Sequence, residues 1–339
     1  MILHLGNKLA NKGFTPTCVD TLSDLFDSDY NWKAGSDKGN KVFRLLDTLF
    51  LILKYKKQAS LILIDTYSTQ NFWMAYLASR LAKRLNIPYA AILHGGNLPK
   101  RFEKSSEKRR KFWYDAYRVI SPSKYLQDYF QKQNIPTELI PNGIALKDYT
   151  FKERNVFAPN LLYVRALHGI YNPEMAIKVL HQIAIKYPRA KLCMVGPAKD
   201  DSLQKCKALA LELGIENRVE FTGRLSKPDW LALSTKFDVF INPTHFDNLP
   251  VSVIEAMALG IPVVSTNVGG LPYLIDDNRT GLLVEDNDTA AMAAGICSII
   301  ENPLDTMQMA INARAEAGHY DWKGVKQLWK QIFDSCEPI

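Results

Sequence analysis

Short apolar runs alternate with longer helical patterns along almost the whole chain, and this alternation constrains the fold more than any other feature. In the first half, strands are expected at residues 2–5, 61–65, 89–93 and 119–120, with helices near 42–55, 72–85 and 124–131. In the second half, strands at 161–165, 191–195, 219–221, 239–241 and 263–265 alternate with helices at 173–186, 202–213 and 227–234. Parallel strands need long crossover connections, which are usually helices. The pattern therefore predicts an α/β fold with two parallel sheets.

The 339 residues are enough for two domains, each with its own core. Ile140-Pro141-Asn142-Gly143-Ile144 leads into a polar, basic connection that ends near Pro159. We therefore expect a first domain at residues 1–150 and a second at 151–320. After Thr289 the pattern is helical only, and a last helix within residues 321–339 has an apolar face formed by Trp322, Leu328, Trp329 and Phe333.

Composition narrows the class of protein. The longest apolar patch, residues 45–53, is interrupted by Asp47 and Thr48 and is too short to cross a bilayer. The N-terminus lacks the charged start and long apolar region of a secretory signal. The five cysteines are odd in number and show no Cys-x-x-Cys spacing. A cytoplasmic protein without a structural metal is expected.

Charge is divided unevenly between the two halves. Residues 1–150 hold 23 Lys and Arg against 13 Asp and Glu, a net charge of +10, whereas residues 151–339 hold 19 against 22, a net charge of -3. The densest basic stretch lies within residues 100–113 and includes Phe102, Phe112 and Trp113. Three interpretations stay open: a solvated helix face, a site for an acidic acceptor, or a peripheral contact with an anionic membrane at the inner face of the cell membrane, with shallow insertion of the aromatic rings. Nucleic acid is not expected, because no zinc-ligand spacing or RNP-type motif is present.

One segment, residues 245–270, groups chemistry-bearing residues around a helix N-terminus. A polar loop at residues 242–248 follows an apolar strand and leads through Asn248-Leu249-Pro250 into a helix that Gly260 ends. The next strand ends in Asn267-Val268-Gly269-Gly270, so both loops would open into one crevice of a parallel sheet. The free N–H groups of the helix favour an anion, and Asp247 and Glu255 can accept hydrogen bonds from sugar hydroxyls. These features predict a site for a sugar nucleotide.

The same segment resembles the carboxyl-terminal signature of family four retaining glycosyltransferases of the GT-B fold. That signature has a Glu-x7-Glu element, then Ala-Met-Ala, Gly-x-Pro-Val-Val and a Gly-Gly loop; here Asp247 stands at the first acidic position and Glu255 at the second. Asn142-Gly143-Ile144 and Ser121-Pro122-Ser123 also resemble family motifs. The resemblance implies two Rossmann-like domains that face a central cleft, with a C-terminal helix that crosses back to the first domain.

The resemblance also implies an activity: transfer of a sugar from a nucleotide diphosphate donor to a hydroxyl acceptor, with retention at the anomeric carbon. The acceptor would be a glycan or a lipid-linked molecule in cell-surface polysaccharide biosynthesis. By resemblance, Glu255 holds the ribose, Asp247 the transferred sugar, Arg165 the diphosphate and His94 the sugar from the opposite domain, while Gly6 lets the backbone approach the donor. A lone histidine such as His94 is otherwise more often structural.

The family's lysine is missing from its usual place, where this chain has Ile170-Tyr171-Asn172-Pro173. Lys199 or His168 is the expected replacement. No Asp-x-Asp motif is present, so helix dipoles and basic side chains must offset the charge of the leaving diphosphate, and the reaction is expected to need no metal or other cofactor. Two alternatives stay open: a sugar-nucleotide epimerase on the same fold, and a non-catalytic member that binds a nucleotide or glycan.

Overall fold

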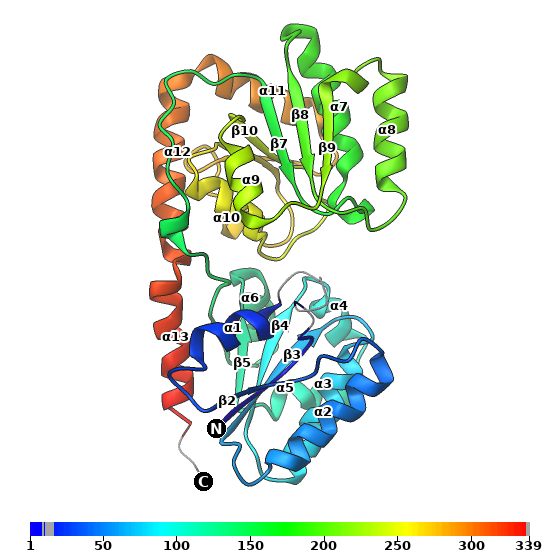
Figure 1. Cartoon of the computed structure of the whole chain (residues 1–339), viewed down its shortest axis with the longest axis vertical. Coiled ribbons are helices and arrows are strands. Elements are labelled where there is room, and N and C mark those ends of the chain that lie inside the picture. Colours follow the sequence, from blue (N-terminus) through cyan, green and yellow to red (C-terminus); the bar gives the residue numbers. More distant parts are fainter. Residues whose placement is uncertain (9, 11–16, 337–339) are drawn as a thin grey trace. The chain divides into compact units, whose positions relative to one another are not determined.

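A computed structural model describes residues 1–8, 10 and 17–336 of the chain (Figure 1). The chain forms two compact units: unit 1 contains Met1–Pro141 and the segment from Val325 onward, and unit 2 contains Asn142–Gly324. The sequence placed the first border later, at residue 150. The structure places it earlier because Ile144 and Tyr149 are buried in the core of unit 2.

Unit 1 is built on one sheet of six parallel strands in the order β2-β1-β3-β4-β5-β6. Its strands are β1 (Ile2–Leu5), β2 (Trp32–Ala34), β3 (Leu61–Tyr67), β4 (Tyr89–His94), β5 (Arg118–Ser121) and β6 (Thr137–Leu139). Its helices are α1 (Cys18–Phe26), α2 (Lys41–Tyr55), α3 (Phe72–Arg84), α4 (Leu98–Glu103), α5 (Glu107–Tyr114) and α6 (Lys124–Lys132). The strand order reverses between β1 and β3, which is where open sheets of this kind bind ligands.

The last helix, α13 (Trp322–Asp334), enters unit 1 from Val325. The Phe333 ring packs edge-on against Phe26 with ring centroids 5.1 Å apart. Tyr30 donates to Asp334 at 2.7 Å, and Lys330 pairs with Asp29 at 2.9 Å. The expected return of the C-terminal helix to the first domain is confirmed, and its apolar face supplies the contact.

Unit 2 contains a second sheet of six parallel strands in the order β12-β11-β10-β7-β8-β9. Its strands are β7 (Asn160–Val164), β8 (Lys191–Val195), β9 (Val219–Gly223), β10 (Val239–Asn242), β11 (Val263–Thr266) and β12 (Leu282–Val284). Its helices are α7 (Pro173–Lys186), α8 (Ser202–Glu212), α9 (Lys227–Ser234), α10 (Val251–Ala258), α11 (Thr289–Glu301) and α12 (Pro303–Ala317). Counted along the chain, this is the 3-2-1-4-5-6 order of a Rossmann sheet, with its switch point between β7 and β10.

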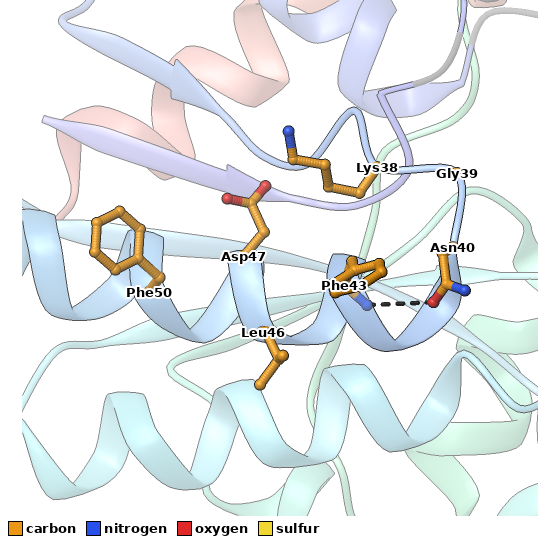
Figure 2. A pocket seen from close by; sticks show the side chains of 7 residues that line it. All are labelled: Lys38, Gly39, Asn40, Phe43, Leu46, Asp47 and Phe50. Carbon is orange, nitrogen blue, oxygen red and sulfur yellow. Dashed lines mark hydrogen bonds between the residues drawn. The ribbon is translucent and has the colours of Figure 1, made fainter.

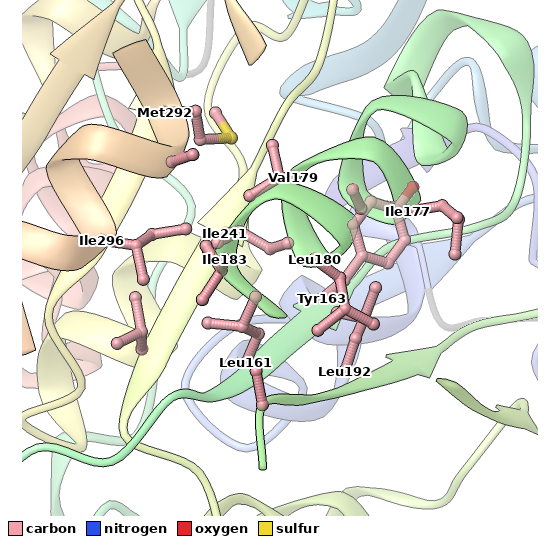
Figure 3. Close-up of a cluster of buried hydrophobic side chains, with 14 of the residues drawn as sticks. Leu161, Tyr163, Ile177, Val179, Leu180, Ile183, Leu192, Ile241, Met292 and Ile296 are labelled. Atoms are coloured by element: carbon pink, nitrogen blue, oxygen red, sulfur yellow. The ribbon is translucent and has the colours of Figure 1, made fainter. Parts of the chain in front are cut away.

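Helices cover both faces of this second sheet, as the near-continuous apolar strands predict. Leu161 and Tyr163 of β7 pack on one face against α7 and α11, where Ile183 and Ile296 are also buried (Figure 3). Leu162, which points to the other face, belongs to the core formed with α10. The expected α/β fold of two parallel sheets is confirmed.

The basic stretch at residues 100–113 folds differently from the expectation. Phe102, Phe112 and Trp113 are all buried in the core of unit 1, where Trp113 stacks on Phe72 with centroids 5.2 Å apart. The expected insertion of these three rings into a membrane is therefore wrong, because the rings are used for packing. Within the part of the chain that the structure describes, no helix has both the length and the apolar run needed to cross a membrane.

Candidate functional site

The switch point of unit 2 brings together the loops that follow β7 and β10. Thr244 donates through its hydroxyl to the carbonyl of Ile170 at 3.1 Å, and the His245 N–H donates to the same carbonyl at 2.9 Å. Arg165 directly follows β7, and Asp247 lies in the loop after β10. Two neighbouring strand ends thus place one cation and one carboxylate at the same edge of the sheet.

The Gly269-Gly270 loop after β11 packs directly on this loop. The Gly270 N–H donates to the Asp247 carbonyl at 2.9 Å. Gly269 has φ of +57°, and a Cβ there would lie 2.1 Å from the same carbonyl oxygen; a Cβ on Gly270 would lie 1.7 Å from the Asn248 carbonyl oxygen. Only glycine allows this approach. The structure therefore brings Asp247, Asn248 and the two glycines together, as the sequence predicts.

Arg165 and Asp247 form an ion pair through Nη2 and Oδ2. Burial disfavours the charged guanidinium, but the Asp247 carboxylate outweighs this effect and raises the pKa of Arg165. The Arg165 guanidinium also lies over the Tyr171 ring, 4.6 Å from its centroid. Asp247 Oδ1 accepts from the N–H of Asn248 at 2.8 Å, which orients the carboxylate. Arg165 Nε is buried and, among the described residues, has no hydrogen-bond partner.

Helix α10 begins at Val251 with Pro250 as its N-cap. Pro250 offers no side-chain acceptor, and the first N–H of the helix to donate to its carbonyl is that of Val253, at 3.1 Å. The N–H groups of Val251 and Ser252 therefore remain available to an anion. Leu249 packs beside the core that contains Val253. Within the first turn, the hydroxyl of Ser252 is buried without a hydrogen-bond partner in the described part of the chain. The start of the helix thus combines backbone donors with a hydroxyl that lacks a partner.

Glu255 is buried one turn further along α10 and contacts two residues that the sequence did not indicate. Tyr149 donates to Glu255 Oε1 at 2.6 Å, and Lys227 forms an ion pair with the same oxygen. Lys227 also contacts the Tyr149 hydroxyl. Burial raises the pKa of Glu255, and Lys227 offsets part of this rise. Glu255 is therefore held by a tyrosine and a lysine.

Of the two acidic residues expected in the site, Asp247 and Glu255, the second is paired with Lys227. Lys199, the expected replacement, lies on the loop after β8 with an exposed side chain. His168 accepts from the Ile170 N–H at 3.1 Å and lies near Asp200. The only sequence signal for Lys227 is its place at the start of a helix after a strand, in Gly223-Arg224-Leu225-Ser226-Lys227.

In unit 1, His94 lies at the end of β4 and contacts a buried acid. Asp65 Oδ1 is 2.9 Å from His94 Nε2 and 3.1 Å from His4 Nε2. Burial alone would raise the pKa of Asp65, but the imidazoles of His94 and His4 outweigh it and hold this pKa well below its usual range. An ionised carboxylate only accepts, so both rings donate through Nε2. His94 also stacks on Tyr67, with centroids 5.0 Å apart.

Gly6 follows β1 and is buried against the same acid. A Cβ at Gly6 would lie 2.3 Å from Asp65 Oδ2 and 2.4 Å from a methyl group of Val19. Space for Asp65 is therefore a sufficient structural reason for glycine here.

Asp65 and two neighbouring side chains, His4 and Cys18, are of types that can bind a metal ion. Ligand atoms of His4, Cys18 and Asp65 all lie within 4.8 Å of one another. Burial, reinforced by the Asp65 carboxylate, raises the pKa of the Cys18 thiol well above its usual value. A metal binds the thiolate and would have to displace this proton, as well as the hydrogen bond between His4 and Asp65. We therefore describe His4 and Asp65 as a hydrogen-bonded pair with the Cys18 thiol beside it.

Comparison with known families identifies the chain. The family described as glycosyl transferases group 1 matches residues 150–316, and the family described as glycosyltransferase family 4 matches residues 1–148. The chain belongs to the group 1 glycosyltransferases of family 4. This finding confirms the resemblance seen in the sequence.

The chain has relatives in several bacteria. An uncharacterized glycosyltransferase of Haemophilus influenzae is 30% identical over 207 residues, which cover 61% of this chain and 57% of that protein. D-inositol 3-phosphate glycosyltransferase of Corynebacterium jeikeium is 23% identical over 181 residues, covering 52% of this chain and 43% of that protein. The chain thus spans about half the length of the curated relatives that it matches.

Solved structures show the same fold over nearly the whole chain. HepE of Anabaena in complex with UDP has a TM-score of 0.77 and 19% identity, and the match covers 98% of this chain and 99% of HepE. A glycosyltransferase of Rickettsia africae has a TM-score of 0.71 and 16% identity, covering 99% and 98% of the two chains. These likenesses confirm the GT-B fold.

In unit 2 each of the two carboxylates, Asp247 and Glu255, is paired with a cation. Arg165 faces Asp247 and Lys227 faces Glu255, both at the carboxyl edge of the sheet in unit 2. Guanidinium and ammonium groups can each bind diphosphate oxygens, and the carboxylates can accept from hydroxyls. The arrangement offers both kinds of contact within one loop cluster.

Proposed function

We propose that this glycosyltransferase moves a hexosyl group from a nucleoside diphosphate sugar to a hydroxyl of a glycan or lipid-linked acceptor, with retention, during assembly of a cell-surface polysaccharide. The observation that carries the donor assignment is the pairing of Arg165 with Asp247 and of Lys227 with Glu255 at the switch point of unit 2. Two cations and two carboxylates match the two halves of such a donor: an anionic diphosphate and neutral hydroxyls.

The proposed roles follow from these contacts. Arg165, Lys227 and the free N–H groups at the start of α10 would bind the diphosphate. Glu255 would then accept from the ribose hydroxyls and Asp247 from the transferred sugar. Backbone groups of the loop from Asn248 to Pro250 and of the Gly269-Gly270 loop would contact the same ligand. HepE of Anabaena is known in complex with UDP and with UDP-glucose, which supports a nucleotide-sugar donor.

In the proposed reaction the bond between the anomeric carbon and the β-phosphate oxygen breaks, and a bond forms between that carbon and the acceptor oxygen on the same face of the sugar. The acceptor proton passes to the departing phosphate oxygen. Positive groups of the protein neutralise the charge that develops on the diphosphate, so no metal is required. His94, held by Asp65, would contact the sugar.

Two measurements test the proposal in sequence. Calorimetry with nucleoside diphosphates, followed by nucleotide sugars of the preferred base, identifies the donor. Nuclear magnetic resonance of the product then shows whether the anomeric configuration of the donor is kept. An inverted product contradicts retention, and conversion of the donor without any acceptor supports the epimerase instead. Binding without hydrolysis, transfer or conversion supports a non-catalytic member of the family.

A further inference from the structure

Helix α2 exposes its apolar side chains and buries polar ones. Phe43 is 63% exposed and Phe50 is 59% exposed, and with Leu46 they are spaced three and four residues apart, so they form one stripe. The side of α2 that faces the core instead buries Arg44 and Thr48 together with Ile52. Surface helices normally show the opposite distribution. Packing within unit 1 therefore does not account for the apolar residues of the exposed stripe.

A pocket of about 410 Å³ lies along this stripe. Its lining is shown in Figure 2: Lys38, Gly39, Asn40, Phe43, Leu46, Asp47 and Phe50. Asn40 caps the helix by accepting from the Val42 N–H at 2.9 Å, which fixes the loop beside the two phenylalanines. The surface is thus a shaped hollow between a loop and a helix.

Helix α3, which packs against α2, also exposes apolar side chains. Trp73 is 45% exposed, and Leu77 lies one turn further along α3. The guanidinium of Arg109 lies 5.6 Å and that of Arg101 5.8 Å from the Trp73 ring. The basic stretch of residues 100–113 therefore borders the surface through Trp73. We call the exposed side chains of Val42, Phe43, Leu46, Phe50, Leu53, Trp73 and Leu77 the α2–α3 face.

Basic residues outnumber acidic ones on the segments that carry and border the α2–α3 face. Residues 33–57 contain six lysines and Arg44 against only two acids, Asp37 and Asp47. Lys41 lies at the start of α2, and Lys54, Lys56 and Lys57 lie at its end; all four are exposed. Lys104, Lys108 and Lys111 of the neighbouring basic stretch are exposed as well.

We propose that the α2–α3 face docks on an anionic lipid bilayer, with α2 lying in the plane of the interface. Apolar rings and a tryptophan would enter the headgroup region while the surrounding lysines contact anionic lipid. The charge distribution favours a bilayer over a second copy of the chain, because self-pairing would bring like charges together. The side chains that would contact the bilayer are exposed, unlike the buried rings of residues 100–113. Docking of this kind does not depend on transferase activity.

Vesicle flotation tests this docking with the full chain. The probes are phosphatidylcholine vesicles and equimolar phosphatidylcholine–phosphatidylglycerol vesicles, each at low and high salt. We expect binding only to the anionic vesicles, weakened by salt. Replacing Phe43 and Phe50 by serine should weaken binding by about tenfold or more, since both rings would leave the interface. Replacing the exposed Ile185 and Leu304 of unit 2 by serine is the matched control and should change nothing.

The contribution of the lysines to vesicle binding is tested with a second variant and its matched control. Each lysine near an anionic leaflet contributes a factor of about five, so Lys54→Gln, Lys56→Gln and Lys57→Gln together should weaken binding by about a hundredfold. The same change at the exposed Lys178, Lys207 and Lys236 of unit 2 is the control. Wild-type protein that stays unbound with anionic vesicles at low salt overturns the proposal. So does equal binding by the Phe43 and Phe50 variant, or a dimer in solution that these two changes dissociate.

Discussion

Replacing Lys227 by methionine removes the cation beside Glu255 and keeps most of the aliphatic side chain. Burial raises the pKa of Glu255 above its ordinary value of 4.5, and Lys227 offsets part of that rise. In the variant Tyr149 still donates to Glu255, so the carboxylate keeps one hydrogen bond. We expect the pKa of Glu255 to rise further, because a buried charge without its partner is unfavourable.

The sign of the stability change follows from proton linkage. A carboxyl whose pKa is higher in the folded state binds more protons when folded, so the free energy of unfolding falls as pH rises above the unfolded pKa. The variant should match the wild type at acidic pH and become less stable as the pH approaches neutrality. Losing one partner of a buried pair costs about 3–5 kcal/mol, and a surface pair is worth about 0–1 kcal/mol.

Lys227 lies between these limits, because 46% of its side chain is exposed. We therefore expect a loss of about 1–2 kcal/mol at neutral pH, which for a unit of this size lowers the Tm by about 2–8 °C. Thermal denaturation between about pH 4 and pH 8 measures it. Lys199→Met is the matched control, since Lys199 is exposed on another loop, and it should leave the Tm unchanged. A Tm difference that is equal at every pH, or equal for the two variants, would refute the reasoning.

The remaining predictions concern binding and turnover. Glu255→Ala should weaken nucleoside diphosphate binding by about 1.5–3 kcal/mol in calorimetry, whereas Asp247→Ala should chiefly reduce transfer; unchanged binding by Glu255→Ala removes the ribose assignment. His94→Ala should bind free nucleotide normally but turn over slowly, and full activity would return His94 to a structural role. Asp65→Asn should also slow turnover and change the nitrogen chemical shifts of the His94 ring, because the amide no longer holds Nε2 as an obligate donor; unchanged shifts contradict this positioning role. EDTA should leave transfer intact, and an activity abolished by EDTA and restored by magnesium or manganese rejects the proposed metal independence.

Strands of four or more residues were predictable from the sequence, because each contains a recognisable run of apolar side chains. Most of these strands are buried, and the edge strand β9 is only partly buried. The missed strands β2, β6 and β12 are each three residues long and lie at sheet edges. Trp32-Lys33-Ala34, for example, carries too few apolar side chains to distinguish it from a loop. Such edges form because a neighbouring strand offers unpaired backbone groups, which is a tertiary cause.

The site was predictable only where neighbouring residues carry the signal. Asp247, Asn248 and the two glycines lie in loops at adjacent strand ends, so parallel topology alone brings them together. Lys227 and Glu255 are 28 residues apart in the sequence and lie on different helices. No local sequence pattern therefore predicts their contact. The error at Phe102, Phe112 and Trp113 has a similar origin: the two short helices contain both basic and aromatic residues, and only tertiary packing decides which of them are buried.

The two ion pairs of unit 2 connect charge recognition with hydroxyl recognition in the proposed mechanism. A diphosphate that takes over Arg165 and Lys227 would release Asp247 and Glu255 as acceptors in the same event. The carboxylates would then find partners in the ribose and the sugar, which avoids leaving buried charges unpaired. Inorganic phosphate or diphosphate alone would break the ion pairs without supplying those hydroxyls. The site should therefore bind a complete nucleotide sugar better than the sum of its parts, because the anionic and the hydroxyl contacts depend on each other.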